Sequence, residues 1–244
     1  MVHARSVRLA AVIVLGGAVA LATTACGGPM QAGAAAVVQG ERTSDRDVQS
    51  EVASVVSLVE RAGLTQGGVT DSQRAALAKA QISLLVEVAK LQKVADDLGV
   101  TVGPDADAEE RGILVRSART SLGPKFTGSD NEAVALADIQ TQRASGVAPS
   151  VVPVFTHIQA LKNAIATNQA AQLHIDLNAL DAKSAQKLDD AIQALEQKAA
   201  GEIDVKVSPR YGAFDPEKGD IFGATTSWIR PTKDQLAARQ QQPQ

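Results

Sequence analysis

Apolar residues recur every three or four positions through most of the chain, which is the spacing of one face of an α-helix. The first such series runs from Val48 to Val59. Ser44 and Asp47 stand before it with the spacing of a capping box, and Gly63 follows it. The pattern predicts a helix that begins at Ser44 and ends at Gly63.

A second, longer series begins after Thr70 and Gln73, which repeat the capping arrangement. Its inward positions are Leu77, Ile82, Leu85, Val88, Leu91 and Val94. Gly99 then stands where a helix would end. We therefore expect a helix that starts at Thr70 or Asp71 and stops at Gly99.

Four further helices are expected, separated by segments rich in Gly, Pro and Ser. They cover residues 104 to about 121, 130–144, about 151–172 and 181–200. Pro104 fits a first helical turn, and the acidic residues after it favour the positive end of the helix dipole. Gly201 is expected to end the last helix. The pattern leaves open whether residues 176–180 form a bend or continue a helix.

Two segments have the pattern of strands. Residues 34–38 are an apolar run followed by the turn residues Gln39 and Gly40, whereas Ile203, Val205 and Val207 alternate with polar residues. Because a lone strand is unstable, we expect these segments to pair although they lie more than 160 positions apart. The predicted fold is mainly α, with about six helices closed by a small sheet that pairs the N- and C-terminal strands.

The start of the chain is typical of an export signal. Arg5 and Arg8 supply positive charge, an apolar run covers residues 9–22, and Thr23 to Ala25 lead to Cys26, the only cysteine. This segment resembles the lipobox of bacterial lipoproteins, although Thr23 stands where an aliphatic residue is usual.

The lipobox resemblance implies a signal peptide over residues 1–25 and a lipid on Cys26. A flexible tether over residues 26–33 would then hold the domain on the extracytoplasmic face of the cell membrane. The alternative is a buried cysteine that follows an ordinary signal or an uncleaved anchor.

Charge and composition narrow the function. Without Arg5 and Arg8, which precede Cys26, 22 of the 24 basic residues remain against 27 acidic ones, so we expect no attraction to nucleic acid. One cysteine allows no disulfide framework within the chain. Aromatic residues make up 2% of the chain, which predicts a core of aliphatic side chains packed between helices and disfavours a small-molecule pocket.

The residue types that serve catalysis or metal binding have spacings that favour structural roles. His157 and His174 are too far apart to bind one ion from neighbouring helical turns, and the acidic series at 105–110 lacks the glycine of a calcium loop. The adjacent pairs Asp96–Asp97 and Asp189–Asp190 diverge by about 100° on a helix, so neither pair can share a proton. We expect no enzymatic activity, no cofactor and no metal.

Four aromatic residues fall near the C-terminus. Tyr211 and Phe214 are expected to pack the terminal strand against the helices. Phe222 and Trp228 lie in residues 215–244, which show no periodicity and are expected to form an irregular tail. These two side chains are candidates for contact with a partner, or for a strap on the domain.

Three short segments resemble the SurA N-terminal domain family. They are residues 35–41 before the Ser44 cap, residues 98–102 after the long helix, and residues 205–212, which read Val-Lys-Val-Ser-Pro-Arg-Tyr-Gly. The similarity spans residues 34–214 and implies a helical chaperone module. The family usually has an apolar residue just before the helix cap. Thr43 stands there instead, which predicts a weaker first turn.

SurA and the related PrsA also carry parvulin prolyl-isomerase domains, and no stretch of this chain has their glycine- and aromatic-rich composition. The resemblance therefore implies a membrane-anchored protein that binds unfolded or extended polypeptides of exported proteins without ATP or catalysis. The alternative is a non-catalytic scaffold lipoprotein that recruits a specific cell-envelope partner. A lipoprotein that binds a small molecule is the third and least favoured reading.

Overall fold

A computed structural model describes residues 32–65, 68–141 and 146–223. Within these ranges six α-helices account for most of the chain. They are α1 (Asp45–Arg61), α2 (Asp71–Leu98), α3 (Pro104–Leu122), α4 (Asp130–Thr141), α5 (Val152–Gln172) and α6 (Ala182–Glu202). Two single 3₁₀ turns, Pro149–Val151 and Leu177–Ala179, precede α5 and α6.

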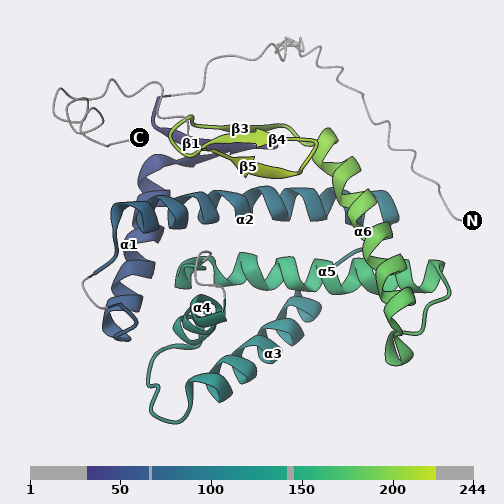
Figure 1. The fold of residues 1–244 in the computed structure, drawn as a ribbon, viewed down its shortest axis with the longest axis horizontal. Coiled ribbons are helices and arrows are strands. Elements are labelled where there is room, and N and C mark those ends of the chain that lie inside the picture. Colours follow the sequence, from purple (N-terminus) through teal and green to yellow (C-terminus); the bar gives the residue numbers. More distant parts are fainter. Residues whose placement is uncertain (1–31, 66–67, 142–145, 224–244) are drawn as a thin grey trace, which may run out of the picture.

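Helix α2 is the central element of the fold. Figure 1 shows it lying beneath a small sheet, with α5 running along its other side and α1 and α6 crossing near its two ends. Its side chains are buried in both directions, with Ile82 and Val86 facing the sheet and α1, and Leu91 and Val94 facing α5 and α6. Full burial of an aliphatic side chain such as Ile82 contributes about 2 to 3 kcal/mol.

The predicted helix ends are confirmed where capping residues define them. Ser44 and Asp47 form a capping box at the start of α1, and Thr70 and Gln73 form another at the start of α2. Gly99 ends α2 in the left-handed conformation, with φ of 66°, where a side chain would be strained.

The predicted pairing of the two distant strands is also confirmed. Strand β1 (Ala34–Val38) lies between β2 (Glu41–Ser44) and β3 (Val205–Val207), and both pairings are antiparallel. Ala36 stands opposite Val207, and Val37 stands opposite Lys206. Strand β1 thus forms the middle of the sheet, and its residues Ala35 and Ala36 are fully buried.

Strand β2 was not predicted. A two-residue turn at Gln39 and Gly40, both with positive φ (51° and 82°), reverses the chain directly into it. Its sequence Glu-Arg-Thr-Ser has no apolar alternation, so register with β1 rather than burial defines the strand. Thr43, expected only to weaken the start of α1, is a half-buried member of this strand.

The expected irregular tail is wrong for its first residues. Strands β4 (Ala213–Asp215) and β5 (Asp220–Phe222) form a hairpin across the boundary placed at residue 215. Ile221 is fully buried with Tyr211 in the cluster under the sheet, and Phe214 packs against it. The expected packing of Tyr211 and Phe214 against the helices is therefore confirmed.

Smaller corrections concern element ends. Helix α6 continues through Gly201 to Glu202, because Ala199 and Ala200 are buried and hold the last turn in place. Residues 176–180 contain the short 3₁₀ turn, so they form a bend before α6. The end expected for the fourth helix, residues 142–144, lies outside the described residues.

Candidate polypeptide-binding grooves

A groove of about 630 Å³ lies between α2, α5 and the turn of the β4–β5 hairpin, and we call it the long groove. Its apolar wall is built by Ala76, Ala80, Leu84, Val86, Val147, Phe155 and Ile158. Ala76, Ala80 and Leu84 of α2 recur every four residues beside the stripe that faces the sheet, to which Val86 belongs. The long groove is thus a second, partly open apolar stripe of α2.

A row of alternating charges joins three helices along this groove. The Lys90 ammonium lies 2.8 Å from Glu196 of α6 and 2.6 Å from Glu87, and Glu87 in turn lies 3.0 Å from Lys162 of α5. Burial disfavours the charged forms of Glu87 and Lys90. The attraction between these opposite charges outweighs the cost of burial, so the pKa of Glu87 is lowered and that of Lys90 is raised. The row therefore stays ionised and fixes α5 and α6 to α2.

Asp138 of α4 also lines the long groove. Burial raises the pKa of its carboxyl to about 6, although the Val147 N–H donates to it at 3.2 Å and acts in the opposite direction. This carboxyl therefore changes charge within the groove wall near pH 6.

Phe222, a predicted partner contact, stands near the hairpin end of the same groove. It is 41% exposed. The ammonium of Lys218 lies 4.5 Å from its ring centre, and that of Lys79 lies 5.8 Å away. Both lysines line the long groove, so they place an aromatic face next to its rim.

A smaller hollow of about 420 Å³ lies on the other side of α2, beneath the outer strand β2, and we call it the edge notch. Its lining combines a strip of α2 with the underside of the sheet. These residues are Val38, Gln39, Glu41, Thr43, Leu85, Val88, Ala89, Gln92, Lys93 and Asp96. The apolar floor, Leu85, Val88 and Ala89, is only half-buried.

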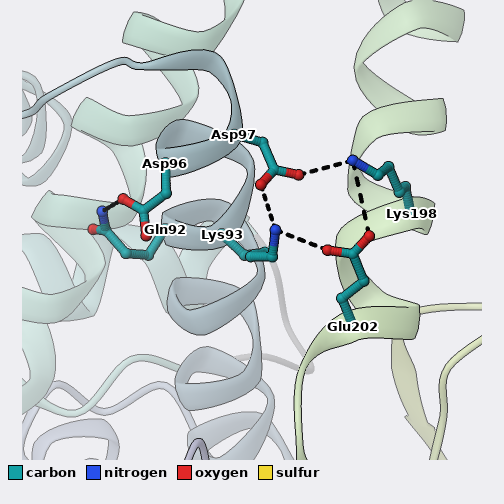
Figure 2. Close-up of polar contacts among 6 residues, drawn as sticks. All are labelled: Gln92, Lys93, Asp96, Asp97, Lys198 and Glu202. Atoms are coloured by element: carbon teal, nitrogen blue, oxygen red, sulfur yellow. Dashed lines mark hydrogen bonds and ion pairs between the residues drawn. The ribbon is translucent and has the colours of Figure 1, made fainter.

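Figure 2 shows how the charges at one end of the edge notch are used. Lys93 bonds to Asp97 and lies 2.7 Å from Glu202 of α6, while Lys198 lies 3.0 Å from Asp97. The hydrogen bonds that the Lys93 ammonium donates to Asp97 and Glu202 raise its pKa to about 12. Asp96 turns away from this network and accepts a hydrogen bond from the Gln92 side-chain amide at 2.8 Å.

The other residues singled out from the sequence are separate from both grooves. His157 of α5 bonds to Asp107 of α3 at 2.9 Å, whereas His174 is exposed just after α5 with φ of 55°. Asp189 and Asp190 are exposed on α6. His157 therefore lies on a helix flank, as expected, whereas His174 lies in the turn that follows α5.

Cys26 and Trp228 lie outside the described residues, so the predicted lipid attachment and the predicted second partner contact are not located. Within residues 32–65, 68–141 and 146–223, no group of three His, Cys, Asp or Glu side chains is arranged to hold a metal ion. In the same ranges no helix has the length and apolar character needed to cross a membrane.

Comparison with models of protein families, with curated proteins and with solved structures gave no match for this chain. The resemblance to the SurA N-terminal domain therefore stays a prediction. The sequence did not locate either groove, because each is assembled from segments far apart in the chain. The signal present in the sequence was the second apolar stripe of α2, at Ala76, Ala80 and Leu84.

Proposed function

We propose that this protein binds extended segments of unfolded, exported polypeptides without ATP or catalysis, on a domain of the SurA N-terminal kind that lacks an isomerase. The observation that carries the proposal is the long groove, where an apolar wall stands open between charged rims. Such a surface takes up many sequences through small apolar contacts, and their weakness allows release without an energy source.

The groove also has a stable frame. The row of ion pairs formed by Glu196, Lys90, Glu87 and Lys162 holds α5 and α6 in place against α2. The apolar wall between these helices therefore stays accessible. Because the wall is preformed, binding orders only the polypeptide segment, which lowers the entropic cost of binding.

The test is suppression of aggregation by the full chain in detergent micelles. A chemically unfolded, unrelated protein is diluted with it, and light scattering is followed. We expect a several-fold excess of the wild-type chain to slow aggregation. Ala80→Trp, which fills the long groove, should lose most of this effect. Ala75→Trp, on an exposed position of the same helix outside the groove, should keep it.

Absence of protection by the wild-type chain would contradict the proposal. The alternative, a scaffold lipoprotein for one cell-envelope partner, would then gain support if a single protein from envelope extracts bound the wild-type chain and not a variant with both Phe222 and Trp228 replaced by alanine.

We further propose that a lipid on Cys26 anchors the domain at the extracytoplasmic face of the membrane, where unfolded chains would emerge at high local concentration. Cells grown with radiolabelled palmitate should incorporate label into the wild-type chain and not into Cys26→Ser. The same variant should leave the detergent phase on phase separation. Label retained by Cys26→Ser would contradict the anchor.

A further inference from the structure

The outer edge of β2 carries backbone groups that face away from the sheet. The turn at Gln39 and Gly40 makes Val38 and Glu41 a directly hydrogen-bonded pair, and the Asp45 N–H donates to the Gly33 carbonyl at 2.8 Å. Because hydrogen bonding alternates along a strand, residues 41, 43 and 45 bond toward β1. The N–H and C=O of Arg42 therefore point outward.

No further strand covers this edge in the described parts of the chain, where the sheet order is β2, β1, β3. The side chains of Val38, Glu41 and Thr43 lie on the α2 face of the sheet, directly above the edge notch. A strand added beside β2 would continue that face. Every second side chain of it would then point down onto Leu85, Val88 and Ala89 of α2.

The charges around the edge notch favour a basic occupant. Lys93 is engaged by Asp97 and Glu202, as Figure 2 shows, so it leaves little free positive charge. Glu41 and Asp96 have no cationic partner among the described residues. The Arg42 side chain lies on the opposite face of the sheet and donates to the Ala32 carbonyl at 3.1 Å, away from the notch.

We propose that an extended segment of a bound polypeptide adds to β2 as a fourth strand over the edge notch, with aliphatic and basic side chains both on the strand face that points down to α2. The inference rests on the proposed function and adds to it a second binding site, with a recognition mode and a substrate class. Backbone pairing ignores sequence, as binding of many unfolded chains requires, whereas the notch and its two carboxylates select aliphatic and basic side chains.

The geometry also sets the strength of this pairing. The edge offers the donor and acceptor of one residue, Arg42, so the added strand gains few backbone bonds and leaves readily. A short edge with charged residues is also a device that limits permanent association between sheets. Reversible capture of an extended segment fits both features.

The test uses fluorescence anisotropy of a labelled peptide that repeats Val-Thr-Lys-Thr, so that Val and Lys lie on the same face of the added strand (the Val/Lys peptide). A matched peptide repeats Val-Thr-Glu-Thr (the Val/Glu peptide), and each is titrated with the full chain in detergent micelles. The wild-type chain should bind the Val/Lys peptide at least fivefold more tightly. Arg42→Pro removes the outward N–H and should weaken binding at least fivefold, whereas Arg42→Ala keeps that N–H and should bind like wild type. A double variant, Glu41→Lys with Asp96→Lys, should reverse the preference between the peptides.

Equal binding by Arg42→Pro and Arg42→Ala, or an unchanged preference in the double variant, would overturn the inference. Should Arg42→Pro fail to fold, a Val/Lys peptide with N-methyl groups on consecutive residues, which has no N–H to donate from either edge, answers the same question with the wild-type chain. It should bind at least fivefold more weakly, and equal binding would overturn the pairing.

Two further measurements separate this inference from its alternatives. In an Ala80→Trp background, where the long groove is filled, Arg42→Pro should still weaken Val/Lys peptide binding at least fivefold, so failure of the proposed function at that groove is distinguishable from failure at the notch. In sedimentation experiments the wild-type chain and Arg42→Pro should show the same state of self-association. A dimer that this variant splits would assign the edge to a second copy of the chain and overturn the proposal.

Discussion

The Asp138 carboxyl is half-buried in the wall of the long groove, and the Val147 N–H is its hydrogen-bond donor. Because burial raises its pKa to about 6, the folded chain binds a proton there between about pH 4 and pH 6 that the unfolded chain has released. Stability from this group is therefore present at low pH and is lost as the pH rises through 6.

Replacing Asp138 by Asn removes the titrating charge and keeps an oxygen that accepts from Val147. We expect Asp138→Asn to stabilise the fold by about 1 kcal/mol at pH 7.5, since the partly solvated carboxylate carries only part of the cost implied by its pKa. The gain should be much smaller at pH 5. Urea unfolding at both pH values measures it, and Asp189→Asn on the exposed face of α6 is the control. Equal gains at both pH values would contradict the raised pKa.

At the scale of elements, the ends that the sequence predicted best are those fixed by local chemistry. Ser44 and Thr70 accept hydrogen bonds from backbone N–H groups of the first helical turn, and Gly99 ends its helix in the left-handed conformation. These effects involve only neighbouring residues, so they do not depend on the rest of the fold. Gly201 failed as a helix end for the converse reason. Its φ is not positive, and packing of Ala199 and Ala200 carries α6 past it.

The elements that were missed depend on partners rather than on their own pattern. Strand β2 is polar and exists through its register with β1, and β4 and β5 are three residues each, too short to show a period. The same reason applies to the edge notch, whose floor comes from α2 and whose roof comes from β1 and β2. Sequence spacing predicted the helices that build both grooves but not how they meet.

At the scale of the molecule, the pairing of β1 with β3 connects the two ends of the described chain. The alternation of Val205 and Val207 with polar residues was sufficient to predict this pairing, because the sequence has few other apolar segments of strand type that could be the partner. The Gln39 N–H donates to the Asp204 carbonyl, and the Ser208 N–H donates to the Ala35 carbonyl. This pattern makes Val38 and Val205 a non-hydrogen-bonded pair, in which the two side chains lie close together.

We therefore expect Val38→Cys with Val205→Cys to form a disulfide, in a chain whose Cys26 is replaced by Ser so that these are the only thiols. The bond closes a long loop and should stabilise the oxidised form by about 3 kcal/mol over the reduced one. Thiol titration under denaturing conditions and urea midpoints with and without reductant measure this. A matched pair at residues 38 and 64 should stay reduced. Two free thiols in the 38 and 205 pair would contradict the register.

The central position of β1 also sets an order of events during biosynthesis. The strand leaves the ribosome early, yet one of its two neighbours, β3, follows only after all six helices have been made. Contacts that close so long a loop form late and slowly. Until then β1 lacks its β3 neighbour, so the sheet is completed only once the last part of the described chain has emerged.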